Sequence, residues 1–292
     1  MPDSDAVLDI KDLDVRYRTV SGDVTAVDGV NLQVKRGEIL GVAGQSGCGK
    51  STMATAVLGL LRPPGYVAGG SALFNRRGQE PVDVLTASEV VLRRLRWRSL
   101  AYLPQGSMNS LNPIMRIRDQ FADVMMQHGW TSDDNDDASP APGQRPGRRD
   151  RAALRERIVE LLAEVGLDAS VADMYPHELS GGMKQRVIIA MSVALRPELL
   201  IADEPTTALD VMIQRVVIQN LADLRDRLGV TMMVITHDMG VHAQLVDRVA
   251  VMNDGKIVEV GAVDQVFNHP AEPYTQDLIS SIPDLTVREE AS

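Results

Sequence analysis

Eight residues in the first part of the chain could bind a polyphosphate. Residues 44–51 read Gly-Gln-Ser-Gly-Cys-Gly-Lys-Ser and fit the pattern G-x-x-x-x-G-K-[ST] without a gap. The glycines let such a loop curl so that successive backbone N–H groups point at an anion. In this pattern Lys50 reaches the β- and γ-phosphates, and the Ser51 hydroxyl binds Mg²⁺. The segment therefore predicts a phosphate-binding loop.

The residues on either side predict the strand and the helix that such a loop needs. Residues 38–43 are mostly apolar and indicate a buried strand, and residues 51–61 indicate a helix. A helix N-terminus at the phosphates adds a partial positive charge. A glycine-rich turn that fits the pattern by chance is the alternative, and the strand–loop–helix context favours the phosphate loop. The candidate nucleotide-binding residues here are Gly44, Ser46, Gly47, Cys48, Gly49, Lys50, Ser51 and Thr52.

Two carboxylates follow an apolar run much later in the chain. Residues 199–202 read Leu-Leu-Ile-Ala, and Asp203 and Glu204 come next. A phosphate loop needs a carboxylate beyond a neighbouring strand to hold the Mg²⁺ shell, and Asp203 supplies one. Glu204 is placed to polarise a water molecule against the γ-phosphate. A strand that ends in a solvated acidic turn is the alternative, and the presence of the phosphate loop favours the two chemical roles.

A second glycine-containing stretch begins a predicted helix. Residues 179–186 read Leu-Ser-Gly-Gly-Met-Lys-Gln-Arg. They could form a helix N-cap followed by flexible glycines. They could also form a second anion site, because the Ser180 hydroxyl, the exposed N–H groups and the helix dipole would all favour a negative charge. This stretch lies 130 residues after Lys50, so it does not obviously belong to the same cradle.

The other apolar patterns predict an α/β protein. Apolar and polar residues alternate at 10–17 and 30–34, before the phosphate loop, which indicates a small, largely antiparallel sheet. An apolar stripe from Ile213 to Leu228 indicates a helix closed by Gly229. Three short continuous apolar runs indicate strands covered on both faces, as in a parallel sheet. They are 199–202, 232–235 and 249–252.

The middle of the chain predicts helices, at 88–97, 118–128, 152–165 and 182–195. They suggest a helical subdomain inserted into the α/β core. Residues 131–151 are rich in Asp, Ser, Pro, Gly and Arg and change from acidic to basic, so we predict a mobile surface loop there. A regulatory contact is the alternative. The predicted parts are the core (5–98 and 196–265), the helical subdomain (99–195) and a C-terminal extension (266–292).

Composition excludes several classes of protein. The chain has 292 residues, of which 44% are hydrophobic and 24% are charged, as is usual for a globular protein. No apolar run approaches 18 residues and the N-terminus is acidic, so we expect neither a membrane span nor a secretory signal. Its single cysteine, Cys48, suits a reducing compartment. A net charge of −10 and only 3% aromatic residues argue against binding to nucleic acid or to anionic lipid.

Several of these stretches together resemble the ATP-binding-cassette (ABC) ATPases. They are the phosphate loop, Gln105, residues 179–186, the Ala-Asp-Glu-Pro run at 202–205, the Ala-Leu-Asp run at 208–210, and His237. The match covers roughly residues 8–285, and the Leu-Ser-Gly-Gly sequence is far more specific than the phosphate loop alone. The resemblance implies an ABC ATPase domain over residues 5–285. Its fold is a RecA-like P-loop NTPase core with an N-terminal antiparallel β subdomain and an inserted helical subdomain.

The resemblance also implies roles for residues outside the loop. In that family two cassettes pair head to tail, so Ser180, Gly181 and Gly182 would clamp the γ-phosphate of ATP held by the partner cassette. Completion of a site in trans can be worth about 10³–10⁵ in rate. Asp210 would lie at the seam between the cassettes, and it could equally be a helix N-cap, or both.

Three further residues acquire expected roles in the same way. Gln105 would contact Mg²⁺ and the attacking water, and would report the nucleotide state to the helical subdomain. His237 would hydrogen-bond the γ-phosphate. Tyr17 would stack on adenine, although an ordinary strand tyrosine packed in the sheet remains an alternative. The implied catalytic residues are Glu204, His237 and Gln105, and the implied Mg²⁺ residues are Ser51, Gln105 and Asp203.

Two segments resemble a narrower group, the cassettes of dipeptide, oligopeptide and nickel importers. Residues 107–113 (Ser-Met-Asn-Ser-Leu-Asn-Pro) follow Gln105, and residues 269–275 with 281–283 resemble that group's C-terminal stretch. Glu272 stands where a second histidine is frequent. Some members continue into a cysteine-bearing segment that binds an iron–sulfur cluster. This chain has no cysteine there, so we expect ATP and Mg²⁺ but no cluster.

The resemblance implies the energising subunit of an importer, with peptides as the favoured solute. Nickel, sugars or another small solute remain open, as does an exporter. The implied partners are a second ABC ATPase subunit, in this group commonly a different chain, two membrane permease subunits and an extracytoplasmic solute-binding protein. The chain would then lie on the cytoplasmic face of the cell membrane as a peripheral subunit. We expect no nucleic acid partner.

Overall fold

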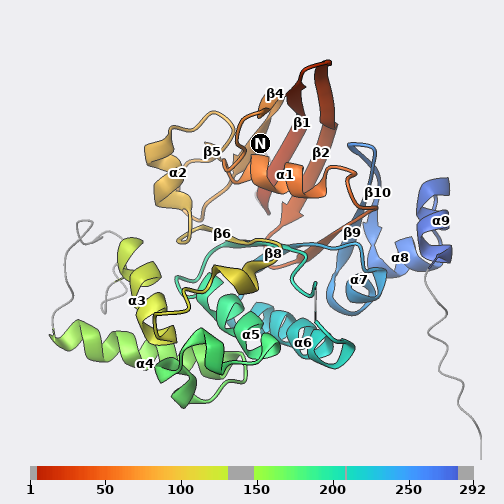
Figure 1. Ribbon diagram of the computed structural model, residues 1–292. Helices are drawn as coiled ribbons and strands as arrows, with labels where there is room; N and C mark the ends of the chain where they lie inside the picture. The colour runs from red at the N-terminus through yellow and green to blue at the C-terminus, as the bar shows by residue number, and fades with distance from the viewer. Residues whose placement is uncertain (1–4, 131–147, 208, 282–292) are drawn as a thin grey trace, which may run out of the picture.

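The structure, a computed structural model, describes residues 5–130, 148–207 and 209–281. These residues form two β-sheets, with helices between the sheets and on the far face of the larger one (Figure 1). The predicted α/β class is confirmed. Among the described residues, no helix combines the length and the apolar character needed to cross a bilayer.

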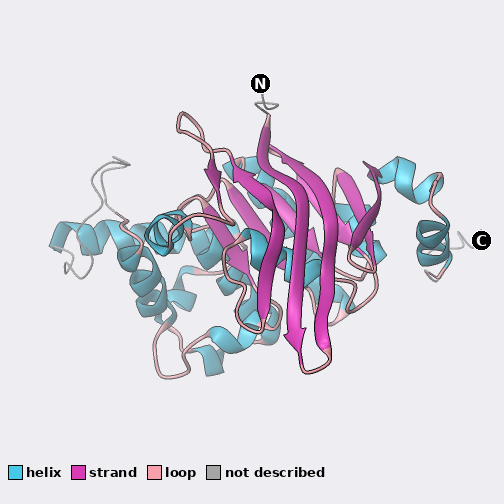
Figure 2. Cartoon of the chain, turned by 90° about the horizontal axis from the view of Figure 1, so that it is seen from above, coloured by secondary structure: helices cyan, strands magenta, loops and turns pink. Residues whose placement is uncertain are grey.

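The smaller sheet is antiparallel and has the strand order β2-β1-β4-β5. Its strands are β1 (Ala6–Thr19), β2 (Gly22–Lys35), β4 (Gly65–Phe74) and β5 (Val82–Asp83). The antiparallel pairing of β1 and β2 confirms the sheet that the alternating residues before the phosphate loop predicted. The sheet extends over the middle of the molecule when it is viewed from above (Figure 2).

The larger sheet has the order β10-β9-β3-β8-β7-β6. The first five strands in chain order, β3, β6, β7, β8 and β9, are mutually parallel, and β10 is antiparallel at one edge. The three predicted buried strands are therefore confirmed. The bounds are β3 (Ile39–Ala43), β6 (Leu100–Leu103), β7 (Leu199–Asp203), β8 (Thr231–Ile235), β9 (Arg248–Asn253) and β10 (Lys256–Ala262).

Alternate residues of the central strands enter two different hydrophobic cores. In β7, Leu199 and Ile201 pack on the side of the antiparallel sheet, together with Met53 of α1 (Lys50–Val57). Leu200 and Ala202 pack on the opposite side, among the helices. Both faces of the parallel sheet are thus buried, which is why these strands read as continuous apolar runs.

The helices of the far face form the second core with the parallel sheet. Here α5 contacts α3, α4 and α6. The remaining helices are α2, which packs toward the antiparallel sheet, and α7, α8 and α9 near the C-terminal end (Figure 1). The bounds are α2 (Glu89–Leu95), α3 (Ile117–Gln127), α4 (Arg148–Glu164), α5 (Gly181–Ser192), α6 (Val211–Leu228), α7 (Met239–Leu245), α8 (Val263–Asn268) and α9 (Pro273–Ser280). Three 3₁₀ turns, η1 (Ser107–Ser110), η2 (Ala169–Asp173) and η3 (Pro176–Glu178), connect them.

The structure corrects three sequence predictions and places a fourth element. The predicted helical segment 99–195 includes β6, which is a strand of the core sheet, so the helices of this segment begin only after it. The predicted helix 88–97 is confirmed as α2, and it packs with the core on the side of the antiparallel sheet, within the predicted core segment 5–98. Residues 148–151 of the predicted loop belong to α4, whereas residues 131–147 lie outside the described residues. The helix predicted at 51–61 ends at Val57, because Gly59 adopts a positive φ of 62°.

Candidate functional site

The strand order brings the sequence-predicted residues to one edge of the parallel sheet. The phosphate loop follows β3, Glu204 follows β7, and His237 follows β8, and these three strands are adjacent. Gln105 follows the neighbouring strand β6. Since parallel strands end at the same edge, that edge is where an open α/β sheet binds its ligand.

The phosphate loop is held in a shape that glycine alone accepts at two positions. Gly44 has a φ of +149°, and a Cβ there would lie 2.2 Å from the backbone oxygen of Met252. Gly49 has a φ of +110°, and a Cβ there would lie 2.3 Å from the oxygen of Ala26. The loop is therefore packed against neighbouring backbone on two sides. Its glycines serve this close approach as well as the curl that the sequence predicted.

Lys50 closes the loop on itself. Its Nζ donates to the backbone oxygens of Gly44, at 2.7 Å, and Gln45, at 2.8 Å, and lies 3.6 Å from the Cys48 sulfur. The lysine is only 6% exposed. Phosphate oxygens would compete with neutral carbonyl oxygens for this ammonium group, and charge-assisted hydrogen bonds are the stronger kind. Lys50 thus rests at the position from which it can bind phosphate.

Cys48 is buried, and its sulfur lies against Gly44. Its backbone oxygen accepts a hydrogen bond from the N–H of Gly255, at 3.0 Å. The thiol fills space beneath the loop, which favours the space-filling role over a reactive one. We still expect alkylation of this thiol to slow ATP turnover, because a bulky adduct cannot fit beneath the loop.

Asp203 fits the predicted role as a Mg²⁺ ligand. Its Oδ2 accepts a hydrogen bond from the Tyr102 hydroxyl at 3.2 Å, while its buried Oδ1 has no hydrogen-bond partner among the described residues. Burial raises the pKa of Asp203 and the nearby Glu204 charge adds to this, whereas the Ser51 and Tyr102 hydroxyls and the Lys50 charge lower it. A cation bound by Oδ1 and Ser51 would satisfy the orphaned oxygen and favour the ionised carboxylate.

Tyr102 was not identified from the sequence as part of the site. Burial, and then the charge and hydrogen bond of Asp203, raise the pKa of the Tyr102 hydroxyl, so it remains a donor to Asp203. It is thus a positioning residue for the proposed metal ligand. The signal available in the sequence was the hydroxyl of Tyr102 on the otherwise apolar strand β6.

Glu204 and His237 are brought together although 33 residues separate them. The Glu204 Oε1 accepts from the backbone N–H of His237 at 3.2 Å and lies 2.7 Å from its ring Nδ1. The Oε2 accepts from the Thr207 hydroxyl at 2.9 Å. The His237 side chain is 65% exposed, and that of Glu204 only 11%. The carboxylate is therefore fixed from within, and the imidazole faces the solvent from which a nucleotide would arrive.

The backbone of Glu204 is also unusual. It has a φ of +51°, in the left-handed region that favours glycine, and its N–H donates to the oxygen of Ile235 at 2.8 Å. Holding a non-glycine residue there costs about 1–3 kcal/mol. Such strain is common at functional sites, and here it turns the carboxylate toward the end of β8.

The segment that carries His237 rests on a second histidine. His242, on α7, is fully buried, and its ring Nε2 lies 3.2 Å from the backbone oxygen of Thr236. A Cβ at Gly41 would lie 2.4 Å from the ring Nδ1, so the flat imidazole occupies the space that the glycine leaves. Burial lowers the pKa of His242 to about 4, against the raising effects of its bond to Thr236 and of the Asp238 and Glu204 charges.

This burial predicts acid sensitivity. The folded pKa of His242 is about 4, below the ordinary 6.5, so the unfolded chain binds more protons between these values. Its contribution to stability is present above pH 6.5 and is lost as the pH falls to 4, by about 3 kcal/mol. In His242→Gln, which keeps a donor but does not titrate, we expect a smaller loss of unfolding free energy over this range, measured by urea titration. Equal losses in the two proteins would contradict the prediction.

Tyr17 reaches the beginning of the helix after the phosphate loop. Its hydroxyl lies 3.2 Å from the Thr52 Oγ1, and its half-buried ring passes close to Gly65, where a Cβ would lie 2.9 Å from the ring. The antiparallel sheet therefore places an aromatic ring beside the phosphate-binding helix. Stacking on adenine stays a prediction.

The Leu-Ser-Gly-Gly stretch is at the start of α5, on the opposite face of the parallel sheet from α1. The Ser180 hydroxyl accepts from the N–H of Met183 at 3.3 Å, which makes it the predicted N-cap. A Cβ at Gly182 would lie 2.6 Å from Ile213 of α6. Among the described residues, no hydrogen bond joins this stretch to the phosphate loop. A role for this stretch at a phosphate held by a second cassette stays a prediction.

Asp210 lies beside this stretch, at the start of α6. Its carboxylate accepts from the N–H of Ile213 at 3.0 Å, so the N-cap interpretation is confirmed. It is exposed. Its place at a seam between two cassettes stays a prediction.

Gln105 is on an exposed turn between β6 and η1. Within the part of the chain that the structure describes, its side chain makes no hydrogen bond with Asp203, Ser51 or Glu204. The strand order places Gln105 at the same edge of the parallel sheet as the phosphate loop. Its contact with Mg²⁺ and water stays a prediction.

Two glutamines missed by the sequence analysis connect the elements of the site. Gln185 is buried on α5, and its Nε2 donates to the backbone oxygen of Pro205 at 2.6 Å. Gln214 on α6 donates to the Asp238 carboxylate at 2.8 Å. Gln185 lies on the largely buried helix α5, and Gln214 is half-buried on α6. A polar residue among apolar ones was the available signal.

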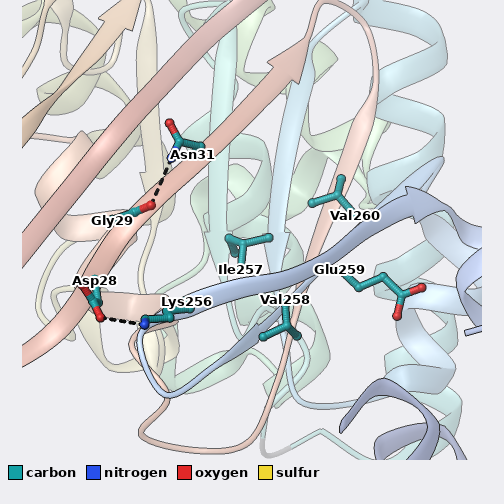
Figure 3. A pocket seen from close by; sticks show the side chains of 8 residues that line it. All are labelled: Asp28, Gly29, Asn31, Lys256, Ile257, Val258, Glu259 and Val260. Atoms are coloured by element: carbon teal, nitrogen blue, oxygen red, sulfur yellow. Dashed lines mark hydrogen bonds and ion pairs between the residues drawn. The ribbon is translucent and has the colours of Figure 1, made fainter. Parts of the chain in front are cut away.

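A groove of about 540 Å³ lies between β2 and β10, away from these residues (Figure 3). It is lined by Asp28, Gly29, Asn31 and residues 256–260, with Lys256 and Asp28 paired at 3.1 Å across it. None of the sequence-predicted site residues lines it. The groove is therefore separate from the phosphate-binding edge.

Comparisons with known proteins agree with this geometry. The family description "ABC transporter" matches residues 27–207, and "Oligopeptide/dipeptide transporter, C-terminal region" matches residues 258–291. The oligopeptide transport ATP-binding protein OppD of Bacillus subtilis is 40% identical over 282 residues, which cover 96% of this chain and 72% of OppD. OppD of Escherichia coli (strain K12) is 40% identical over 284 residues, covering 97% and 77%.

A solved structure has the same fold. It is the dimeric, post-hydrolysis state of the ATP-binding cassette MJ0796 bound to ADP and Pi, with a TM-score of 0.69 and 25% identity. The superposition covers 88% of this chain and 98% of that one.

Proposed function

This chain belongs to the ABC transporter family of ATPases, and we propose that it is the ATP-hydrolysing subunit of a peptide importer. The observation that carries the proposal is the meeting of the phosphate loop, Asp203, Glu204 and His237 at the ends of three adjacent parallel strands. The ABC ATPase fold expected from the sequence is confirmed by the family match and by the solved cassette.

The proposed reaction follows from contacts within the chain. Lys50 exchanges its carbonyl partners Gly44 and Gln45 for phosphate oxygens, and the amides of the loop bind the rest. The His237 ring exchanges its contact with the Glu204 Oε1 for one to the γ-phosphate, which frees one lone pair of that oxygen while the backbone N–H of His237 stays bonded to it. That oxygen then accepts a proton from the water whose oxygen attacks the γ-phosphorus. The bond between the γ-phosphorus and the oxygen that bridges it to the β-phosphate breaks, giving ADP and phosphate.

Mg²⁺, held by Ser51 and Asp203 and contacted by Gln105, would neutralise charge that develops on the phosphates. The buried, unpartnered Oδ1 of Asp203 supports this assignment. We infer no cluster-binding role for the C-terminal extension, since the sequence there contains no cysteine.

Peptides are the proposed solute because of the C-terminal part of the chain. Residues 258–291 match a region described for oligopeptide and dipeptide transporters, and both relatives named above are oligopeptide transport proteins. The relatives are 40% identical over nearly the whole of this chain. The importer assignment rests on this extension as well as on the ATPase core.

The proposed assembly has two cassettes. The separation of the Ser180–Gly182 stretch from the phosphate loop within one chain, and the dimeric state of the solved cassette, both support a composite site. We propose that the partner is a different cassette chain, that both dock on two membrane permeases at the cytoplasmic face, and that an external solute-binding protein delivers the peptide. ATP can drive transport only if it binds the closed pair of cassettes more tightly than the open pair.

The decisive experiment is reconstitution. The chain is purified from membranes with its permeases and second cassette, and the complex is placed in vesicles with the solute-binding protein. We expect ATP-dependent uptake of labelled oligopeptides, and faster ATP turnover when the peptide-loaded binding protein is present. Turnover that responds to nickel or sugar, and not to peptides, would overturn the peptide assignment and leave the ATPase assignment intact.

A further inference from the structure

The C-terminal helix α9 is anchored to the edge strand β10. The Glu259 carboxylate accepts from the N–H groups of Ala271, at 2.9 Å, and Glu272, at 3.2 Å, just before the helix begins. In Figure 3 the Glu259 side chain extends from β10 on the side away from Asp28 and Asn31. Glu259 therefore fixes the start of α9 rather than facing the opposite strand of the groove.

The electrostatics of Glu259 agree with this anchoring role. Partial burial by itself would raise the pKa of Glu259. The Ala271 N–H, the nearby Thr275 hydroxyl and the Glu272 N–H outweigh that effect and lower the pKa of Glu259. The ionised carboxylate is thus the form that holds α9.

At the second position of α9, Tyr274 reaches the phosphate loop. Its hydroxyl accepts a hydrogen bond from the backbone N–H of Gln45 at 3.1 Å, across 229 residues of sequence. The half-buried ring packs against the same core as the far-face helices. This packing holds the ring, and the Glu259 anchor holds the start of the helix that carries it.

Gln45 is hydrogen-bonded to both Tyr274 and Lys50. Its N–H binds Tyr274, and its backbone oxygen accepts from the Lys50 Nζ at 2.8 Å. When the Lys50 ammonium group turns from the Gln45 oxygen to a phosphate oxygen, the hydrogen bond from the Gln45 N–H to the Tyr274 hydroxyl remains and holds Gln45 from outside the loop. A loop fixed in its binding shape loses less conformational entropy when the ligand arrives.

We propose that α9 is a strut for the phosphate loop, with Tyr274 as a positioning residue for ATP binding and Glu259 as its anchor. The proposal rests on the proposed function, since it requires ATP to bind at this loop. It assigns a task to part of the C-terminal region at 258–291. Tyr274 touches no reacting atom, and it acts through the backbone of Gln45.

The test is Tyr274→Phe in the full chain assembled with its partners. This change removes only the hydroxyl. Loss of one hydrogen bond to the loop should raise the KM for ATP about fivefold, while kcat at saturating ATP stays near wild type. A fluorescent ATP analogue on the Glu204→Gln chain should show the same increase in Kd. The unfolding temperature without nucleotide should fall by only a few degrees, as expected for one hydrogen bond, which separates positioning from a general loss of stability.

Two further variants sharpen the result. Ser280→Ala removes a hydroxyl whose bond, to the Asp277 oxygen, stays inside α9, and it should leave the KM for ATP unchanged. Glu259→Ala should raise this KM as Tyr274→Phe does, because it releases the start of α9. An unchanged KM in both Tyr274→Phe and Glu259→Ala would overturn the strut.

The proposal can fail separately from the proposed function. Lys50→Ala should abolish binding of the ATP analogue if the loop is the nucleotide site at all. Binding lost in Lys50→Ala but unchanged in Tyr274→Phe would refute only the strut. Binding retained in Lys50→Ala would refute the site itself, and the strut with it.

Discussion

Glu204→Gln is expected to reduce ATP turnover by at least about 10²–10⁴-fold, the range for removal of a general base, while ATP binding survives. The amide has nearly the same shape as the carboxylate. Its oxygen can still accept from the His237 N–H while its NH₂ group donates to the Thr207 hydroxyl oxygen, so the local fold should persist. It cannot accept the proton of the attacking water. Steady-state phosphate release measures the turnover, and binding of an ATP analogue measures the site.

A second consequence follows for the assembly. If hydrolysis opens the pair of cassettes, Glu204→Gln should accumulate the closed pair in the presence of ATP, which size-exclusion chromatography of the cassettes can detect. Glu160→Gln is the matched control, because Glu160 is an exposed partner of Arg157 on α4 and should affect neither measurement. Unchanged turnover in Glu204→Gln would show that another group is the base.

Gly181→Asp is expected to abolish the composite site without weakening the fold. Gly181 is exposed at the first position of α5, and the nearest atom to an added Cβ is the Met108 sulfur at 3.9 Å, an ordinary contact. An aspartate in the first turn favours the helix dipole, so stability should be kept. Its charge would lie where the proposed partner's γ-phosphate must bind. We expect turnover at that phosphate to fall by about 10³–10⁵.

A shared site is tested by asking which of the two phosphate loops loses ATP hydrolysis in Gly181→Asp. Gly181→Asp should leave binding of ATP to this chain's own phosphate loop unchanged, while hydrolysis fails at the loop of the partner cassette. Gly182→Ala is less informative, because a Cβ there would meet Ile213 at 2.6 Å and disturb the fold directly. A Gly181→Asp complex that hydrolyses ATP at the wild-type rate would contradict a site shared between two cassettes.

The sequence determined those parts of the protein whose physics is local. The phosphate loop could be recognised because a curled anion-binding loop needs glycines and a lysine within eight residues, between a strand and a helix. The strands β7, β8 and β9 could be recognised because burial on both faces leaves only apolar residues. Asp203 and Glu204 followed from their place at the end of one such strand.

Other elements had no clear local signal. The strand β6 has four residues and directly follows an arginine-containing segment, so the pattern did not separate it from the helical subdomain. The strand β4 contains Gly65, Gly69 and Gly70, which lower the strand signal. Both strands exist because neighbouring strands supply their hydrogen bonds, and a single-sequence pattern does not contain those partners.

Only the tertiary structure decided which side chains meet. The contact between Glu204 and His237, the bond from His242 to Thr236, and the reach of Tyr274 to Gln45 join residues that the chain separates by 33, 6 and 229 positions. Residue types and short spacings specify what a segment can form by itself. Strand order and helix packing determine which segments become neighbours, because the burial of apolar faces that drives them has no direction along the sequence.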